Sequence, residues 1–183
     1  MVDNFFDFIG NNNDGHWKIR SISTISGTPI PSANFLTILQ GNLEPSRQGT
    51  WSLKGFRSNI RYAERPEKEQ LIAVQAPLGR SEATYAALIP IRKTAAWWDL
   101  TQEERRAIFE KKSHHTKIGL RYLPAIARQL YHSRDIGEPF DFLTWFEFAP
   151  EHEEQFEALL AALRQSEEWL YVDREIDIRL ERV

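Results

Sequence analysis

Three stretches decide the fold: residues 140–149 read FDFLTWFEFA, residues 150–165 read PEHEEQFEALLAALRQ, and residues 175–183 read EIDIRLERV. The first is short and rich in aromatic residues, which is typical of a strand. In the second, Pro150 occupies a permitted first-turn position and apolar residues recur on one face, which predicts an amphipathic helix. In the third, aliphatic and charged residues alternate strictly, which predicts a strand packed on one face only. Together they predict a strand–helix–strand unit.

Upstream of this unit the sequence predicts further strands and then a helical block. Short segments with β-branched or aromatic residues, bounded by Gly or Pro, predict strands over residues 16–27, 33–43, 50–64, 70–76 and 84–93. Thr101 and Glu104 have the spacing of a capping box, which marks the start of a helix. Pro124 then interrupts the helical pattern, so we expect two helices over residues 113–122 and 124–132, or one kinked helix.

This order of elements predicts an α+β fold in which helices back an antiparallel sheet. The chain has 183 residues, of which 42% are hydrophobic, and this is enough to bury a sizeable core. No repeat and no linker divides it, so residues 1–183 are expected to form a single domain.

Composition excludes several classes of protein. The net charge is -3, without the basic excess of a nucleic-acid binder, so no nucleic-acid partner is expected. The chain has no cysteine, which excludes disulfides, zinc fingers and iron–sulfur clusters. No apolar run approaches the roughly 18–20 residues of a membrane span, and the first residues lack the pattern of a signal peptide. We therefore expect a cytoplasmic protein that does not enter a membrane.

The segment KKSHHTKIGLRYLPAIARQLYHS, residues 111–133, holds the most conspicuous polar group, the pair His114 and His115. A histidine pair at the start of a helix is more often a structural or surface feature than a ligand. Without cysteine, a haem would have to be held by an imidazole, a tyrosinate or a methionine, and Met1 is the only methionine. In one straight helix His115 and Arg128 would point roughly 220° apart, and Pro124 leaves their true relation open.

Two further groups have both a structural and a functional interpretation. Trp97 and Trp98 follow Lys93, and if they lay on a strand they would face opposite sides, so that one of them would lie in a core or a subunit interface. Glu167 and Glu168 near the end of a helix are usually solvated. A ligating histidine, however, needs an acceptor for its second N–H group, and a carboxylate can provide it.

Taken together, KTAAWW (93–98), the spacing of His115 and Arg128, TWFEF (144–148) and SEEWL (166–170) resemble the chlorite dismutase family. Members are haem b proteins with a ferredoxin-like α+β fold, and the resemblance to the short, N-terminally truncated branch covers essentially the whole chain. It implies a dimeric α+β barrel with a complete second ferredoxin-like half, roughly 96–183, and a truncated first half, roughly 15–95. Short members form dimers, so a homodimer is expected.

On the proximal side, the resemblance implies that His115 binds the haem iron and that His114 is a non-ligating neighbour. Glu168 would accept the hydrogen bond from the ligand, with Glu167 as the alternative if the register differs by one.

Elsewhere in the cavity, the resemblance implies that Thr144 and Phe146 form the distal wall. Lys93 and Trp97 would lie near the haem propionates, with Tyr62 as a weaker candidate for the same role.

For the reaction, the resemblance implies one haem b per subunit and a small anionic substrate, chlorite, which is converted to chloride and O2 through ferryl haem and hypochlorite. Arg128 would be the distal catalytic residue. Relatives that decarboxylate iron-coproporphyrin in haem biosynthesis typically lack this arginine, so Arg128 favours the chlorite reaction. That decarboxylase activity is one alternative, and a non-catalytic haem-binding module is another.

Overall fold

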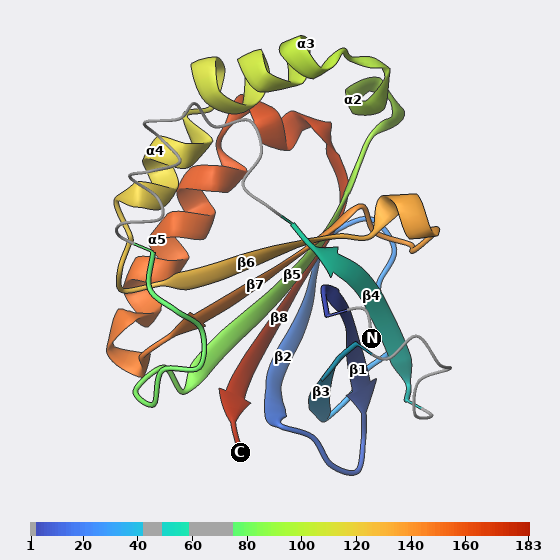
Figure 1. Cartoon of the computed structure of the whole chain (residues 1–183), viewed down its shortest axis with the longest axis vertical. Coiled ribbons are helices and arrows are strands. Elements are labelled where there is room, and N and C mark those ends of the chain that lie inside the picture. The colour runs from blue at the N-terminus through green and yellow to red at the C-terminus, as the bar shows by residue number, and fades with distance from the viewer. Residues whose placement is uncertain (1–2, 42–48, 59–74) are drawn as a thin grey trace.

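The computed structural model describes residues 3–41, 49–58 and 75–183. Within these residues no helix is both long enough and apolar enough to span a membrane. The described chain contains eight strands and a set of short helices, with one longer helix near the C-terminus (Figure 1).

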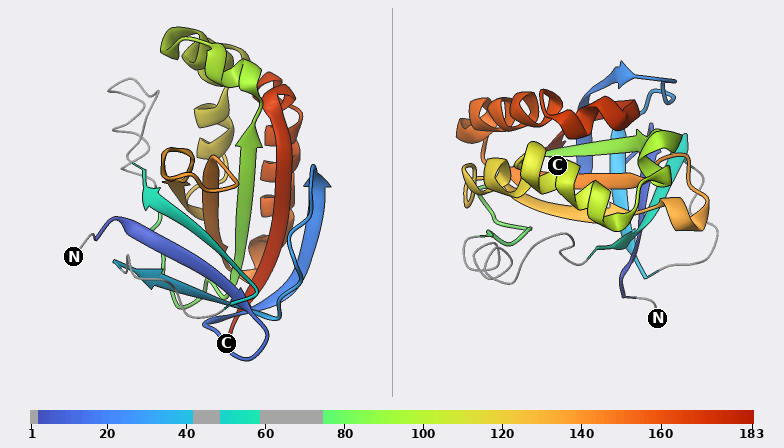
Figure 2. Two further views of the ribbon diagram at one scale, coloured as in Figure 1. Left: turned by 90° about the vertical axis from the view of Figure 1, so that its right-hand side faces the viewer. Right: turned by 90° about the horizontal axis from the view of Figure 1, so that it is seen from above.

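The strands form one closed sheet in which every described pairing is antiparallel. Their order around the barrel is β1-β3-β2-β8-β5-β7-β6-β4. The strands are β1 (Phe5–Asn11), β2 (Trp17–Ser26), β3 (Phe35–Gln40), β4 (Trp51–Arg57), β5 (Tyr85–Lys93), β6 (Ala127–His132), β7 (Phe142–Phe148) and β8 (Val172–Arg182). Only two residue pairs join β2 to β3, and two join β4 to β6. The barrel therefore consists of a long sheet of β2, β8, β5, β7 and β6, closed by a second group of three strands, β1, β3 and β4 (Figure 2).

The helices lie together over the long sheet (Figure 1). They are α2 (Ala95–Asp99), α3 (Gln102–Arg106), a π-helical segment η1 (Ala107–Lys112), α4 (His115–Leu120) and α5 (Glu153–Arg164), with short 3₁₀ segments η3 (Pro150–His152) and η4 (Glu167–Tyr171). A further 3₁₀ segment, η2 (Arg134–Ile136), lies apart from them in the loop between β6 and β7 (Figure 1).

The long sheet separates two hydrophobic cores, because alternate residues of a strand point to opposite faces. On β7, Trp145 packs inside the barrel with Leu88 of β5 and Ile178 of β8. Phe146 packs on the other face, against α5. The second face therefore carries the helices, and it is the face on which the functional site lies.

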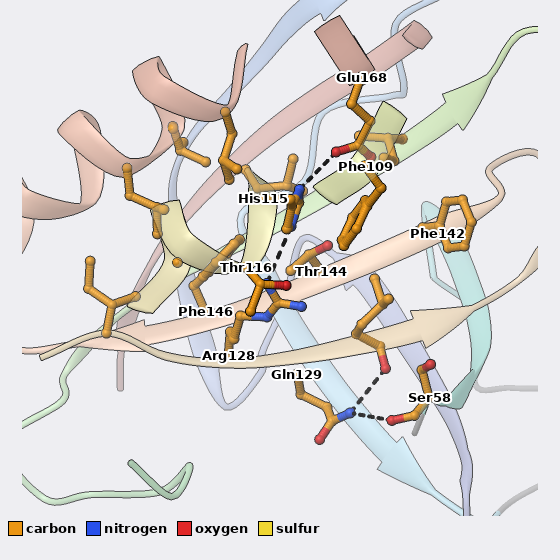
Figure 3. Close-up of a pocket in the computed structure, with 18 of the residues that line it drawn as sticks. Ser58, Phe109, His115, Thr116, Arg128, Gln129, Phe142, Thr144, Phe146 and Glu168 are labelled. Carbon is orange, nitrogen blue, oxygen red and sulfur yellow. Dashed lines mark hydrogen bonds and ion pairs between the residues drawn. The ribbon is translucent and has the colours of Figure 1, made fainter. Parts of the chain in front are cut away.

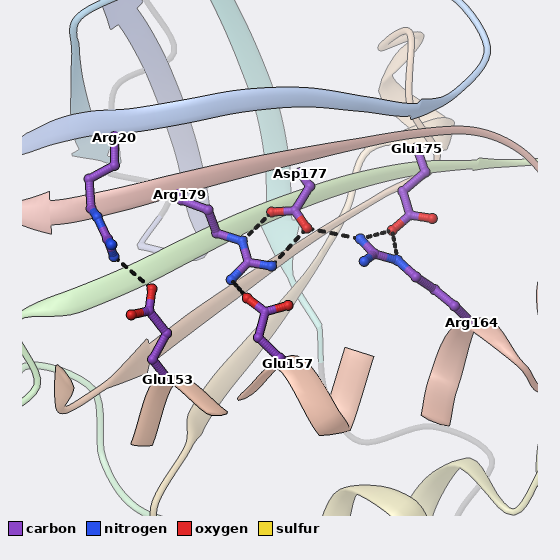
Figure 4. A network of polar contacts seen from close by, with 7 residues as sticks. All are labelled: Arg20, Glu153, Glu157, Arg164, Glu175, Asp177 and Arg179. Carbon is purple, nitrogen blue, oxygen red and sulfur yellow. Dashed lines mark hydrogen bonds and ion pairs between the residues drawn. The ribbon is translucent and has the colours of Figure 1, made fainter. Parts of the chain in front are cut away.

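An ionic network attaches α5 to β8 beside this second core (Figure 4). Arg164 of α5 binds Glu175 at 2.6 Å and Asp177 at 3.0 Å, and Asp177 also pairs with Arg179. Glu175, Asp177 and Arg179 of β8 thus face α5 rather than water, so the prediction that this strand packs on one face only is wrong.

Several predictions from the sequence are confirmed. The strand–helix–strand unit is present as β7, α5 and β8. Thr101 and Glu104 form the predicted capping box at the start of α3, with each side chain bonded to the backbone of the other residue.

Other predictions are wrong. Residues 127–132 form strand β6 and not a helix, because every residue of this segment pairs with β7. Trp97 and Trp98 lie on helix α2, which starts at the N-cap Thr94. Strand β1 was missed altogether, because both of its faces are buried and its sequence shows no apolar–polar alternation.

Candidate functional site

A cavity of about 230 Å³ lies between the long sheet and the helices α4 and α5. Seven of the eight residues that the sequence singles out line it: Lys93, Trp97, His115, Arg128, Thr144, Phe146 and Glu168. Tyr62, the eighth, lies outside the described residues. The fold thus collects side chains from β5, α2, α4, β6, β7 and η4 around one space (Figure 3).

His115 points into this cavity because the chain changes direction just before it. His114 adopts the left-handed conformation, with φ 50° and ψ 38°, and its side chain is exposed. This bend separates η1 from α4, so the two neighbouring histidines face different surroundings. Phe109 of η1 stacks on the imidazole of His115, with ring centroids 4.2 Å apart and planes 21° apart.

The carboxylate of Glu168 holds the inner nitrogen of His115. Its Oε2 lies 2.8 Å from Nδ1 of His115, and its Oε1 lies 2.8 Å from Nζ of Lys93. The backbone N–H of Glu168 donates to Oγ of Ser113 at 2.9 Å. Glu167, the alternative from the sequence, points away and pairs with Lys112. Glu168 is therefore the carboxylate that meets the histidine.

Burial by itself raises the pKa of Glu168, but the charges of His115 and Lys93 and their hydrogen bonds outweigh it and lower the pKa to about 2. An ionised carboxylate can only accept, so Nδ1 of His115 carries the proton. When the ring carries no second proton, its lone pair is on Nε2, which faces Arg128 across the cavity. This is the arrangement of a histidine prepared to bind a metal.

Lys93 lies behind this pair and is buried. Desolvation lowers its pKa below the ordinary value, and Glu168 raises it part of the way back. Its ammonium also sits 4.4 Å above the ring of Trp97. The structure thus brings Lys93 and Trp97 together at the inner end of the His115–Glu168 pair.

Arg128 faces His115 from the opposite wall. It lies on β6, and its Nη1 is 3.4 Å from Nε2 of His115 (Figure 3). Among the described residues no carboxylate lies within ion-pair distance of the guanidinium. Burial lowers the pKa of Arg128, although arginine stays cationic in proteins. Within the described part of the chain, Glu168 and Glu110 act on this cation through their charge, but no carboxylate forms an ion pair with it.

The rest of the lining is mainly apolar. Thr144 and Phe146 of β7 lie beside Arg128, and β6 and β7 are paired there at Arg128 and Phe146. The leucines of α5 close the other side: Leu159, Leu160 and Leu163.

Sequence reasoning missed several contributors. The α5 leucines were predicted only as the apolar face of a helix, and that face turns out to line the cavity as well as the core. Phe109 and Ser113 carry no motif, and no pattern in the sequence would have found them. Trp169 also lines the cavity, with its Nε1 donating to the buried Glu175 at 2.9 Å.

This arrangement suits a metal ion that is already held by a cofactor and needs only one ligand from the protein. Among the described residues no cluster of three or more histidine, aspartate or glutamate side chains could hold a bare ion. A single imidazole faces an apolar space with one cation opposite. That donor set fits an axial ligand to a flat macrocycle, with an anion bound on the far side.

Comparisons with known proteins identify close relatives. A family model described as chlorite dismutase matches residues 32–182. A dimeric chlorite dismutase from Nitrobacter winogradskyi, known from a crystal structure, is 58% identical, with a TM-score of 0.90 over 97% of this chain and 99% of that one. A mutant chlorite dismutase from Candidatus Nitrospira defluvii is 28% identical, with a TM-score of 0.59 over 80% of this chain and 56% of that one.

A curated protein, the chlorite dismutase of Ideonella dechloratans, is 34% identical over 105 residues. The matched region covers 54% of this chain and 34% of that protein, so the chain matches about a third of the length of this curated relative.

Proposed function

The chain belongs to the chlorite dismutase family, and we propose that it is a haem b enzyme that converts chlorite (ClO2−) into chloride and O2. One observation carries the proposal. Arg128, a cation without a carboxylate partner among the described residues, directly faces Nε2 of His115, the nitrogen available to a metal. A ligand for iron and a binding group for an anion thus meet across one apolar cavity.

The residues present fit a haem, with one adjustment. His115 would hold the iron through Nε2, with Nδ1 kept protonated by Glu168. The contact of 3.4 Å between Nε2 and the guanidinium cannot persist once a metal occupies Nε2, so the side chain of Arg128 must withdraw. Its withdrawal also enlarges the cavity, which at about 230 Å³ is below the usual range for organic ligands. The bound haem would supply the redox-active iron that exchanges an oxygen atom with the substrate.

The protein side chains would do the rest. Glu168 accepts the hydrogen bond from the N–H at Nδ1 of His115 and increases the electron donation of the imidazole. Lys93 keeps that carboxylate ionised and anchors it from behind. Arg128 attracts chlorite and holds the anionic chlorine species until both oxygen atoms leave as O2. Phe146 and the α5 leucines limit the entry of water, which keeps the field of the arginine strong.

The finer expectations belong to the same proposal. We propose a homodimer, supported by the dimeric relative from Nitrobacter winogradskyi. We propose that the barrel consists of a truncated ferredoxin-like half, roughly 15–95, and a complete half, roughly 96–183. Roles for Lys93, Trp97 and Tyr62 near the haem propionates and a cytoplasmic location stay predictions.

An oxygen electrode tests the activity directly. Chlorite added to the hemin-loaded protein should release one O2 per chlorite consumed. Arg128→Ala should lower the rate by about 10²-fold, the cost of losing one preorganised charge in a dry site. The exposed Arg121, at the end of α4, provides the matched control, and Arg121→Ala should leave the rate unchanged.

Two results would redirect the assignment. Conversion of iron-coproporphyrin to haem b by hydrogen peroxide, without O2 release from chlorite, would make the protein a decarboxylase. If His115→Ala takes up hemin with an unchanged Soret band, the proposed iron ligand is wrong.

A further inference from the structure

We propose that Glu110 is a positioning residue for His115: it clamps the chain on both sides of the histidine and thereby fixes the direction of Nε2. The inference deepens the proposed function, because it takes His115 as the iron ligand. No pattern in the sequence marks Glu110, and its contacts appear only in the tertiary structure.

Helix α4 begins at His115 without a cap of its own. The preceding residue, His114, is in the left-handed conformation, and its side chain makes no capping hydrogen bond. The first N–H groups of any helix lack partners inside the helix. A helix of six residues has few bonds with which to resist fraying at this end. The histidine that should hold a metal thus stands at the weakest point of the helix.

Glu110 supplies the missing partner from the preceding π-helical segment. Its Oε1 accepts the backbone N–H of Thr116 at 3.1 Å, and it also accepts the hydroxyl of Thr116. A normal N-cap side chain makes the same bond to the second or third residue of a helix. The negative charge is also favourable near the free N–H groups of a helix start.

The backbone of Glu110 holds the other side of the histidine. Its carbonyl oxygen accepts the N–H of His114 at 3.1 Å. One residue therefore binds the N–H groups immediately before and immediately after His115. The π-helical geometry of η1 accompanies this clamp, since the N–H of Ser113 donates to the carbonyl of Ile108, five residues earlier, at 3.0 Å.

Neighbouring residues complete the support with separate roles. Phe109 stacks on the imidazole and Glu168 binds Nδ1, so these two set the rotation of the ring. The carboxylate of Glu110 binds the backbone of α4 at Thr116, and it therefore sets the position from which the ring projects. Loss of Glu110 should loosen the ligand without removing the carboxylate that tunes it.

Four variants separate the possible roles of Glu110. Glu110→Gln keeps the accepting oxygen and loses the charge, whereas Glu110→Leu loses both. Thr116→Val removes only the hydroxyl donor. Glu103→Gln, at an exposed glutamate of α3, controls for a general loss of negative charge from this region.

The first measurement needs no cofactor: hydrogen exchange of the amides of residues 115–120 in the hemin-free protein. Glu110→Leu should speed their exchange about fivefold, the increase expected when a helix loses its capping hydrogen bond. Thr116→Val should show a smaller increase, and Glu110→Gln and Glu103→Gln should match the parent. Unchanged exchange in Glu110→Leu would overturn the proposal.

The second measurement follows the ligand itself in the hemin-loaded protein. Glu110→Leu should release hemin to an excess of scavenger about tenfold faster, as expected for a lost outer support of a metal ligand. It should also broaden the Fe–His vibration of the ferrous state, and Glu110→Gln should restore both properties. Parent-like values for Glu110→Leu would contradict the proposal.

The two measurements also separate this inference from the proposed function. If hemin binding to the parent does not depend on His115, the proposed function fails, and Glu110 then has no iron ligand to position. If binding depends on His115 but not on Glu110, the proposed function stands and the clamp fails.

Discussion

Nζ of Lys93 lies 2.8 Å from Oε1 of Glu168, and the two side chains form a buried ion pair with exposed fractions of only 1% and 6%. The second oxygen of the same carboxylate binds Nδ1 of His115, also at 2.8 Å. The three groups form a continuous lysine–carboxylate–imidazole chain that ends at the cavity.

Breaking the buried ion pair should destabilise the protein strongly. Lys93→Met should lower the free energy of unfolding by about 3–5 kcal/mol, because Glu168 loses a partner that water cannot replace. Lys112 and Glu167 form a pair of the same length, 2.8 Å, but the lysine side chain is 55% exposed. Lys112→Met should therefore have no measurable effect. Urea unfolding of the two variants provides the comparison, and equal losses would contradict it.

Neutralising Glu168 should raise the Fe(III)/Fe(II) reduction potential of the hemin-loaded protein. Glu168→Gln removes the negative charge that strengthens electron donation by His115, so the ferrous state becomes easier to reach. Glu167→Gln is the matched control, because this neighbour binds Lys112 instead. Spectroelectrochemical titration measures both, and a shift of equal size in the control would count against the assignment.

Acid should remove the contribution of Glu168 to stability. Its pKa is about 2 in the folded protein and near 4.3 in an unfolded chain, so the folded state favours the ionised form. That contribution, on the order of 3 kcal/mol, is complete above about pH 5 and is lost as the pH falls toward 2. The difference in unfolding free energy between the parent and Glu168→Gln should therefore shrink over this range. A constant difference in urea titrations from pH 6 to pH 3 would refute this linkage.

The two adjacent histidines should respond in opposite ways to glycine. His114 has φ 50°, a conformation that glycine adopts without steric cost, so His114→Gly should keep hemin binding and raise stability by about 0.5–1 kcal/mol. His115→Gly should lose stable hemin binding. Soret absorbance and thermal unfolding distinguish them. Loss of hemin from His114→Gly would show that the side chain of His114 takes part in the site.

Local sequence was sufficient wherever one rule governed a segment. The alternation of residues 175–183 predicted β8, the apolar face of residues 150–165 predicted α5, and the capping box predicted the start of α3. In α5 and at the start of α3 the local pattern agrees with the tertiary packing. On β8 the pattern predicted the strand, but the charged face that it would leave in water is covered by α5.

Prediction from local sequence failed where pairing between distant strands outweighed the local helix preference. Residues 127–132 contain good helix formers, yet pairing with β7 makes them a strand. Because residues 127–132 form a strand, a helical projection could not show that the side chains of His115 and Arg128 face each other. One residue lies on a helix and the other on a strand of the facing sheet, and their side chains meet across the cavity.

The sequence alone determined the family resemblance, the α+β class and the residue types of the site, because these depend on composition, periodicity and spacing. Tertiary structure decided which glutamate meets the histidine, that Lys93 ends on that glutamate, and that Glu110 clamps α4. Such contacts join segments as far as 75 residues apart. Their geometry depends on how the barrel closes and how the helices cross it, and that packing is a property of the whole chain rather than of any segment.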